Sequence, residues 1–194
     1  MVSPLTSNPF HQVTEHIAEQ SHAMAGATIA ASAALGCSLG EACVRISAAL
    51  LEGEEQQFAR QRVAARLVEI RRRLQELADE DGATILALAH VQEDRDGQGR
   101  RQDRLCQIPL EVGGLAAEAA LLLQDFRVLA RAARDDLEMA ILLLSGTAHA
   151  AALLLDSNLR IWPEPLVRLT RFEPELEALR RQLQGIRPVE RVRG

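Results

Sequence analysis

Three groups of acidic residues in this chain have the chemistry that proton transfer needs. They are Asp79–Asp81 in LADEDGATILAL, Glu111 behind Pro109 in IPLEVGG, and Asp135–Asp136 in RDDLEMAILLL. Two carboxyl groups with separated pKa values can serve as an acid and a base. Acidic residues are equally typical of a solvated surface or of the first turn of a helix, where the helix dipole favours them. Both interpretations stay open for these groups.

A helix of small residues, expected from about Ala25 to Leu51, is the second candidate. The segment 21–47 consists almost entirely of Ala, Gly, Ser, Thr, Cys and a few aliphatic residues. Small side chains leave the unpaired N–H groups of a first helical turn open to a ligand. They also allow neighbouring backbones to approach closely, so tight packing in a helical bundle explains the same composition.

Other catalytic and metal-binding signatures are missing from the sequence. There is no Walker loop and no HExxH, CxxC or GxSxG motif, and lysine is absent, so all 22 basic residues are arginine. The five histidines, at positions 11, 16, 22, 90 and 149, are scattered along the chain. We therefore expect no metal site and no bound cofactor.

The elements that must position these residues are predicted to be helices. Ala and Leu dominate, aromatic residues make up 3% and Tyr is absent, which favours an all-α protein built as an antiparallel bundle of long helices in one domain, residues 1–194. The first expected helix ends near Glu19, the second runs from about Ala25 to Leu51, and the third runs from Glu54 to about Gln92. The fourth has Pro109 in its first turn and continues to about Arg131. The fifth runs from near Asp135 to about Leu155. Residues 93–104 are expected to form a polar loop. Two weaker helical segments, separated by Pro174, are expected to end at Gly185. The side chains of Arg71–Arg73 are expected on a solvated face of the third helix.

The charge and hydropathy of the chain indicate which classes of partner are excluded. The net charge of −5 argues against a general nucleic-acid binder, because phosphate neutralisation dominates such binding. The first residues lack the pattern of a signal peptide, and no apolar stretch of membrane-spanning length is free of charge. The three cysteines fall within helical patterns and read as buried free thiols in a reducing compartment. We therefore expect a soluble cytoplasmic protein with neither nucleic acid nor membrane as a partner.

Collinear blocks of the sequence resemble the formiminotetrahydrofolate cyclodeaminase and methenyltetrahydrofolate cyclohydrolase family from about residue 10 to 184. The matching positions are Gly26, Ser32, Gly36 and Leu39 in the small-residue helix, Glu80 and Asp81 in ADED, Pro109 and Glu111 in IPLE, Asp136, and Asn158 in AAALLLDSN. The similarity lies in the order of the blocks, because no single block is specific. It implies a small all-helical cyclodeaminase-like fold and a homodimer.

The resemblance also implies a function. Members close the methenyl ring of a reduced folate with loss of ammonia from a formimino group, or open that ring by hydrolysis. On this interpretation Asp81 and Asp136 are the catalytic acid and base. The implied substrate-binding residues are Gly26, Ala27, Thr28, Glu80, Pro109, Glu111 and Asn158. The ligand is a tetrahydrofolate derivative that acts as substrate, without a further cofactor.

The chain departs from the family pattern around this implied site. A run of glycines in the family is replaced here by residues 22–27, HAMAGA, and the family's lysine after the long helix has no equivalent. Asp135 and Glu138 replace the serine and glycine of an SDAG-like segment, and Ile85 replaces a phenylalanine. A catalytically inactive helical dimer that serves as a ligand-binding or protein-interaction scaffold is therefore the alternative to an enzyme. A plain helical bundle with a coincidental match is the third interpretation.

Overall fold

The computed structural model describes residues 10–20, 24–89, 95–130, 133–161 and 165–189. Within these ranges it contains helices and no strands, which confirms the expected all-α class. The elements are α1 (Phe10–Glu19), α2 (Ala25–Ser47), the short 3-10 helix η2 (Ala48–Leu50), α3 (Glu54–Ala89), α4 (Arg95–Phe126), α5 (Arg134–Ile161) and α6 (Pro165–Leu183). Histidines 22 and 90 lie outside the described residues.

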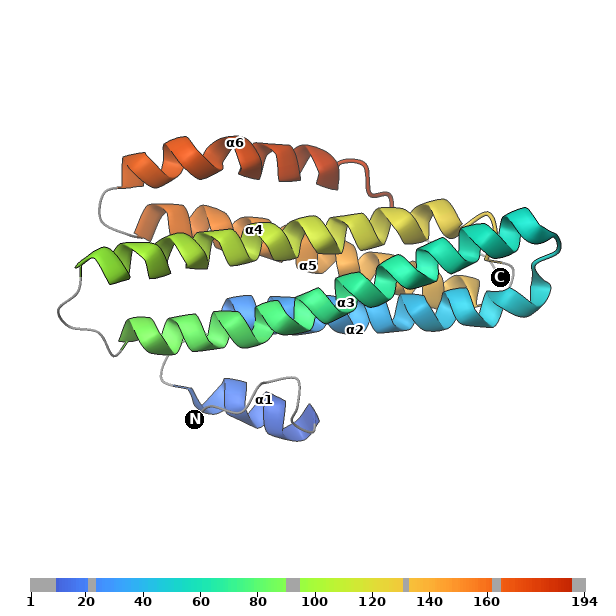
Figure 1. Ribbon diagram of the computed structural model, residues 1–194, viewed down its shortest axis with the longest axis horizontal. Helices are drawn as coiled ribbons and strands as arrows, with labels where there is room; N and C mark the ends of the chain where they lie inside the picture. The colour runs from blue at the N-terminus through green and yellow to red at the C-terminus, as the bar shows by residue number, and fades with distance from the viewer. Residues whose placement is uncertain (1–9, 21–23, 90–94, 131–132, 162–164, 190–194) are drawn as a thin grey trace.

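Four long helices, α2 to α5, form an elongated antiparallel bundle (Figure 1). The helix α6 packs along α4 and α5, and the short α1 lies outside the four long helices (Figure 1). Val13 and Ile17 attach α1 to the hydrophobic core. The largest buried side chains are mostly Leu and Ile from α3, α4 and α5, with Phe172 from α6.

Close approach of the helices depends on residues with little or no side chain. On α2, Ala27, Ala30, Ala34 and Cys37 are buried at the three- and four-residue spacing of one helix face. A Cβ atom added at Gly40 would lie 2.6 Å from Leu123 Cδ1 of α4, so a larger residue would require the end of the Leu123 side chain to move. The small residues of α2 thus have a packing role along most of its length.

Three helices are long and apolar enough, by length and composition alone, to cross a membrane. They are 25–50, 97–126 and 134–161, and about half of each apolar stretch is buried inside the bundle. Core packing therefore accounts for part of this apolar character. The absence of a membrane partner stays a prediction.

The start of α4 differs from the sequence expectation. The helix begins at Arg95, so residues 95–104 are helical rather than a loop, and Pro109 lies inside the helix. Proline has no N–H group, and the carbonyl of Leu105 therefore lacks its normal partner four residues ahead. The Asn158 Nδ2 atom of α5 donates a hydrogen bond of 2.7 Å to this carbonyl. A side chain 53 residues away thus allows α4 to continue through Pro109.

Three smaller boundaries also differ. The helix α6 runs continuously through Pro174, where the sequence indicated a break, and Pro174 is exposed. Asn158 was expected beyond the end of its helix, but α5 continues to Ile161. The small-residue helix ends at Ser47, and η2 forms its continuation.

The pairing of Pro109 with Asn158 yields a stability prediction. Asn158→Ala should lower the free energy of unfolding by about 1–3 kcal/mol, because the buried Leu105 carbonyl loses its only replacement partner among the described residues. Adding Pro109→Ala should restore part of this loss, because alanine returns the backbone N–H group. Urea unfolding of both single variants and the double variant measures the interaction energy between the two positions. Purely additive losses would contradict this interpretation.

Candidate functional site

The carboxyl group of Asp81 lies against the first turn of α2. Asp81, on α3, is only 2% exposed, and its Oδ2 accepts a hydrogen bond of 2.8 Å from the Ala27 N–H group. A Cβ atom at position 26 would lie 2.2 Å from Asp81 Oδ1, so the carboxyl group occupies the space that a side chain at Gly26 would need. The two predicted site segments therefore meet here.

The first turn of α2 has no side-chain cap of its own. Met24, at the N-cap position, makes no capping hydrogen bond, whereas the Thr28 hydroxyl donates back to the Met24 carbonyl over 2.7 Å. Asp81 thus satisfies one of the N–H groups that a helix start leaves unpaired. This is a structural role for Asp81, and it fixes the carboxyl group at the start of α2.

Burial controls the proton affinity of Asp81. Desolvation raises the pKa of its carboxyl group from 3.8 to about 6, and the Ala27 N–H group offsets part of this shift by stabilising the ionised form. A carboxyl group with a pKa near neutrality can both donate and accept a proton at physiological pH. Among the predicted site residues, Asp81 therefore has the properties of an acid–base group.

Asp136 does not join Asp81 within one chain. It is exposed in the first turn of α5, and its charge adds to the effect of burial in raising the pKa of Cys43. Cys43 lies on α2 sixteen residues after Ala27, which at the α-helical rise corresponds to about 24 Å. The two predicted catalytic acids thus lie at opposite ends of α2.

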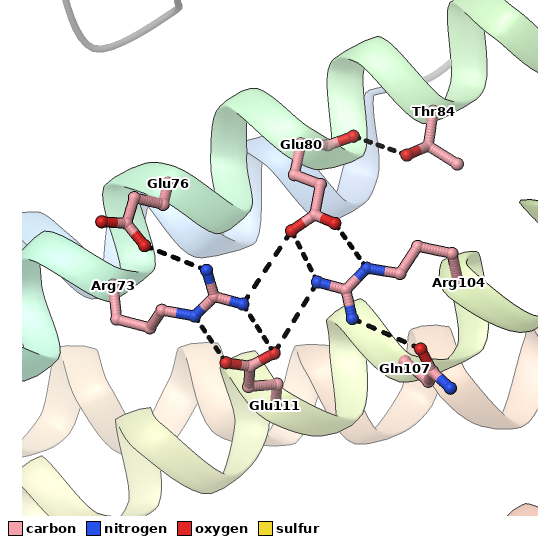
Figure 2. Close-up of polar contacts among 7 residues, drawn as sticks. All are labelled: Arg73, Glu76, Glu80, Thr84, Arg104, Gln107 and Glu111. Carbon is pink, nitrogen blue, oxygen red and sulfur yellow. Dashed lines mark hydrogen bonds and ion pairs between the residues drawn. The ribbon is translucent and has the colours of Figure 1, made fainter.

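Glu80 and Glu111 belong to an ion-pair cluster between α3 and α4 (Figure 2). The Arg104 guanidinium forms two hydrogen bonds, of 2.5 and 2.6 Å, to the Glu80 carboxylate, which hold the Glu80 pKa below its usual value. Arg73 pairs with Glu111 at 2.6 Å and approaches Glu80 at 3.9 Å. Both glutamates therefore already have arginine partners.

The cluster is part of a regular ladder. Along α3 its members are Arg66, Arg73 and Glu80, and along α4 they are Glu118, Glu111 and Arg104, so each successive pair lies seven residues from the last. A seven-residue repeat returns to the same face of adjacent helices. The sequence interpretation missed this ladder, although the spacing of opposite charges was a usable signal. Its expectation for Arg71–Arg73 was wrong for Arg71 and Arg73, which are half-buried and paired with Glu41 and Glu111.

The remaining candidate residues lie apart from the contact of Asp81 with α2. Pro109 and Asn158 are buried at the Leu105 carbonyl, as described above. Cys37, Cys43 and Cys106 are buried free thiols, and burial raises their pKa values to about 12, 11 and 11. In the described part of the chain, no group of three or more His, Cys, Asp and Glu side chains could hold a metal ion.

The raised pKa of Asp81 predicts how stability changes with pH. Between pH 4 and 6 the folded state binds the Asp81 proton more tightly than the unfolded state, so this group's contribution to stability decreases as pH rises. The total decrease is about 3 kcal/mol. The stability difference between wild type and Asp81→Asn should therefore shift by this amount between pH 3 and 7, as measured by urea unfolding. Asp135→Asn, at an exposed acid, is the control, and a difference that stays constant with pH would contradict the prediction.

Comparison with known proteins shows the family and the fold of the chain. The chain matches the formiminotransferase-cyclodeaminase family over residues 9–166. Its fold is similar to the crystal structure of formiminotetrahydrofolate cyclodeaminase from Thermotoga maritima, with a TM-score of 0.79 and 17% sequence identity over 94% of this chain and 93% of that chain. No curated protein sequence matches the chain. Since the family match covers most of its length, this chain belongs to the formiminotransferase-cyclodeaminase family.

Proposed function

We propose that this protein binds a reduced folate that carries a formimino or methenyl one-carbon unit, at the first turn of α2 beside Asp81. The observation that carries the proposal is the buried Asp81 carboxyl group, held on the Ala27 N–H group in the space left by Gly26. Family membership supplies the substrate class. In this proposal Gly26, Ala27 and Thr28 form the turn beside the ligand, where Gly26 and Ala27 are buried and Thr28 is half-buried.

The proposed reaction requires one proton to leave and another to arrive. Ring closure of a formimino group proceeds through attack of the neighbouring exocyclic amine nitrogen of the folate on the formimino carbon and loss of ammonia. Asp81 in its protonated form would donate to the departing nitrogen, and Asp136 would accept the proton of the attacking nitrogen. For hydrolytic ring opening, Asp136 would activate water instead. Both routes need the two acids on opposite sides of one ligand.

A second copy of the chain can bring these acids together. The α2 and α5 helices share an apolar surface that includes Leu35, Met139, Leu142, Leu143 and Leu153, which are 43–70% exposed. Gly36 lies beside Leu143 and Leu144, so the contributions of α2 and α5 are continuous. Exposed apolar surface of this extent is typical of an interface between subunits. We therefore propose that it forms a homodimer.

The position of Leu35 defines the geometry of that dimer. Leu35 is 55% exposed and lies midway along α2 between Ala27 and Cys43. A two-fold axis through Leu35 would place Cys43 of one subunit at the level of Ala27 of the other, because a two-fold interface exchanges equivalent positions. The partner subunit's Asp136 would then approach Asp81, because within one chain the Asp136 charge acts on Cys43. In this proposal each site uses both subunits.

The other predicted substrate-binding residues have a positioning role in this proposal. Glu80 and Glu111 fix the register of α3 against α4, and Pro109 with Asn158 fixes α4 against α5. These contacts determine where α3 presents Asp81, which follows Glu80 directly. Their substitution should therefore affect ligand binding through the fold.

Calorimetric titration with 5-formyltetrahydrofolate tests the proposed site. Wild-type protein should bind it saturably, and Asp81→Asn and Asp136→Asn should each weaken binding at least tenfold, about 1.4 kcal/mol. Asp135→Asn is the matched control, because Asp135 is the exposed neighbour of Asp136. Leu35→Arg should produce monomers in sedimentation analysis and lose binding together with the dimer.

Two outcomes would contradict the proposal. Equal affinity in wild type and both aspartate variants would remove these acids from the site. Absence of binding by a folded, dimeric wild-type protein would favour the non-catalytic scaffold.

A further inference from the structure

We propose that a hollow between the C-terminal half of α3 and the first turns of α4 binds an oxyanion, either a phosphate or a carboxylate group. The hollow has a volume of about 380 Å³ and is lined by Glu80, Ala83, Thr84, Ala87, Gly97, Arg100, Arg101 and Arg104. This volume is at the lower end of the range of small-molecule sites, roughly 300–1,000 Å³. The proposal does not depend on the proposed folate site.

The hollow lies where the ion-pair ladder stops. The position seven residues after Glu80 on α3 is Ala87, and the position seven residues before Arg104 on α4 is Gly97. Both lining residues are small, so the next step of the ladder has neither an acidic nor a basic side chain. The space that an ion pair fills at the earlier steps is open here.

Among the described residues that line the hollow, three are arginines and one is a glutamate. Arg104 is paired with Glu80, but none of the ion pairs within the described residues includes Arg100 or Arg101. The Arg101 Nη1 atom is buried and has no hydrogen-bond partner in the described structure. A buried guanidinium nitrogen without an acceptor is costly, so rotation of the Arg101 side chain toward an anion in the hollow would remove this cost.

The start of α4 also favours an anion in the hollow. Gly97 is the third residue of this helix, so it lies where the unpaired N–H groups of a helix start produce a partial positive charge. Arginine guanidinium groups bind the oxygen atoms of phosphates and carboxylates, frequently through two parallel hydrogen bonds. The chemistry common to both groups therefore defines the ligand class.

The hollow is separate from the contact between Asp81 and α2. Glu80 and Thr84 point toward α4 and the hollow, whereas Asp81 contacts Ala27 of α2. Figure 2 shows Glu80 and Thr84 on α3 near Arg104 of α4. Ligands at the two sites can therefore be tested independently.

Thermal unfolding in increasing inorganic phosphate, with ionic strength held constant by sodium chloride, tests the proposal. The wild-type melting temperature should rise saturably, and Arg101→Gln should weaken the apparent phosphate affinity at least tenfold. Arg72→Gln is the matched control, because Arg72 is an exposed arginine of α3 that does not line the hollow. Without phosphate, Arg101→Gln should melt no lower than wild type, since it removes an unpaired buried nitrogen.

A second variant supplies the missing carboxylate from within the chain. Ala87→Glu places an acidic side chain opposite Gly97, and it should abolish the phosphate response while the protein stays folded. Repeating the titration with succinate identifies the source of the oxyanion: an equal response indicates carboxylates as well, and no response restricts the site to phosphate. An identical phosphate response in wild type, Arg101→Gln and Ala87→Glu would overturn the proposal.

Discussion

The contact between Asp81 and the first turn of α2 is the constraint on which the site depends. Its carboxyl group fills the space beside Gly26 and accepts the Ala27 N–H group, so it fixes the start of α2 against α3. The same burial raises its pKa to about 6. One arrangement therefore determines both the position of a helix terminus and the proton affinity of the group beside it. A side chain at position 26 would disturb both properties together.

The rest of the bundle holds this contact in place through two kinds of interface. Along α2, glycine and alanine allow neighbouring helices to approach closely, as at Gly36 and Gly40. Between α3 and α4, arginine–glutamate pairs recur every seven residues. Half-exposed ion pairs each contribute little to stability, so we infer that their main effect is to favour one register of α3 on α4. The ladder and the small residues thus place Asp81 opposite Ala27.

The sequence predicted the helical class, which follows from its composition, and the family, which follows from the resemblance of collinear blocks. It failed at the start of α4, where Pro109 and the polar run before it indicated a helix boundary. The hydrogen bond from Asn158 that allows the helix to continue comes from another part of the chain and leaves no local signal. The separation of Asp81 from Asp136 could likewise not be predicted, because the order of sequence blocks does not specify distances between them in space. The ion-pair ladder could have been predicted, because the seven-residue spacing of its charged residues is present in the sequence.

The central claim is that one functional site combines Asp81 of one subunit with Asp136 of the other. The most direct test mixes Asp81→Asn and Asp136→Asn subunits in equal amounts, with joint unfolding and refolding, and counts binding sites for 5-formyltetrahydrofolate. A shared site predicts recovery of about one quarter of the wild-type number of sites, because half of the dimers are mixed and each mixed dimer contains one intact site. Binding that stays as weak in the mixture as in either variant alone would contradict the shared site.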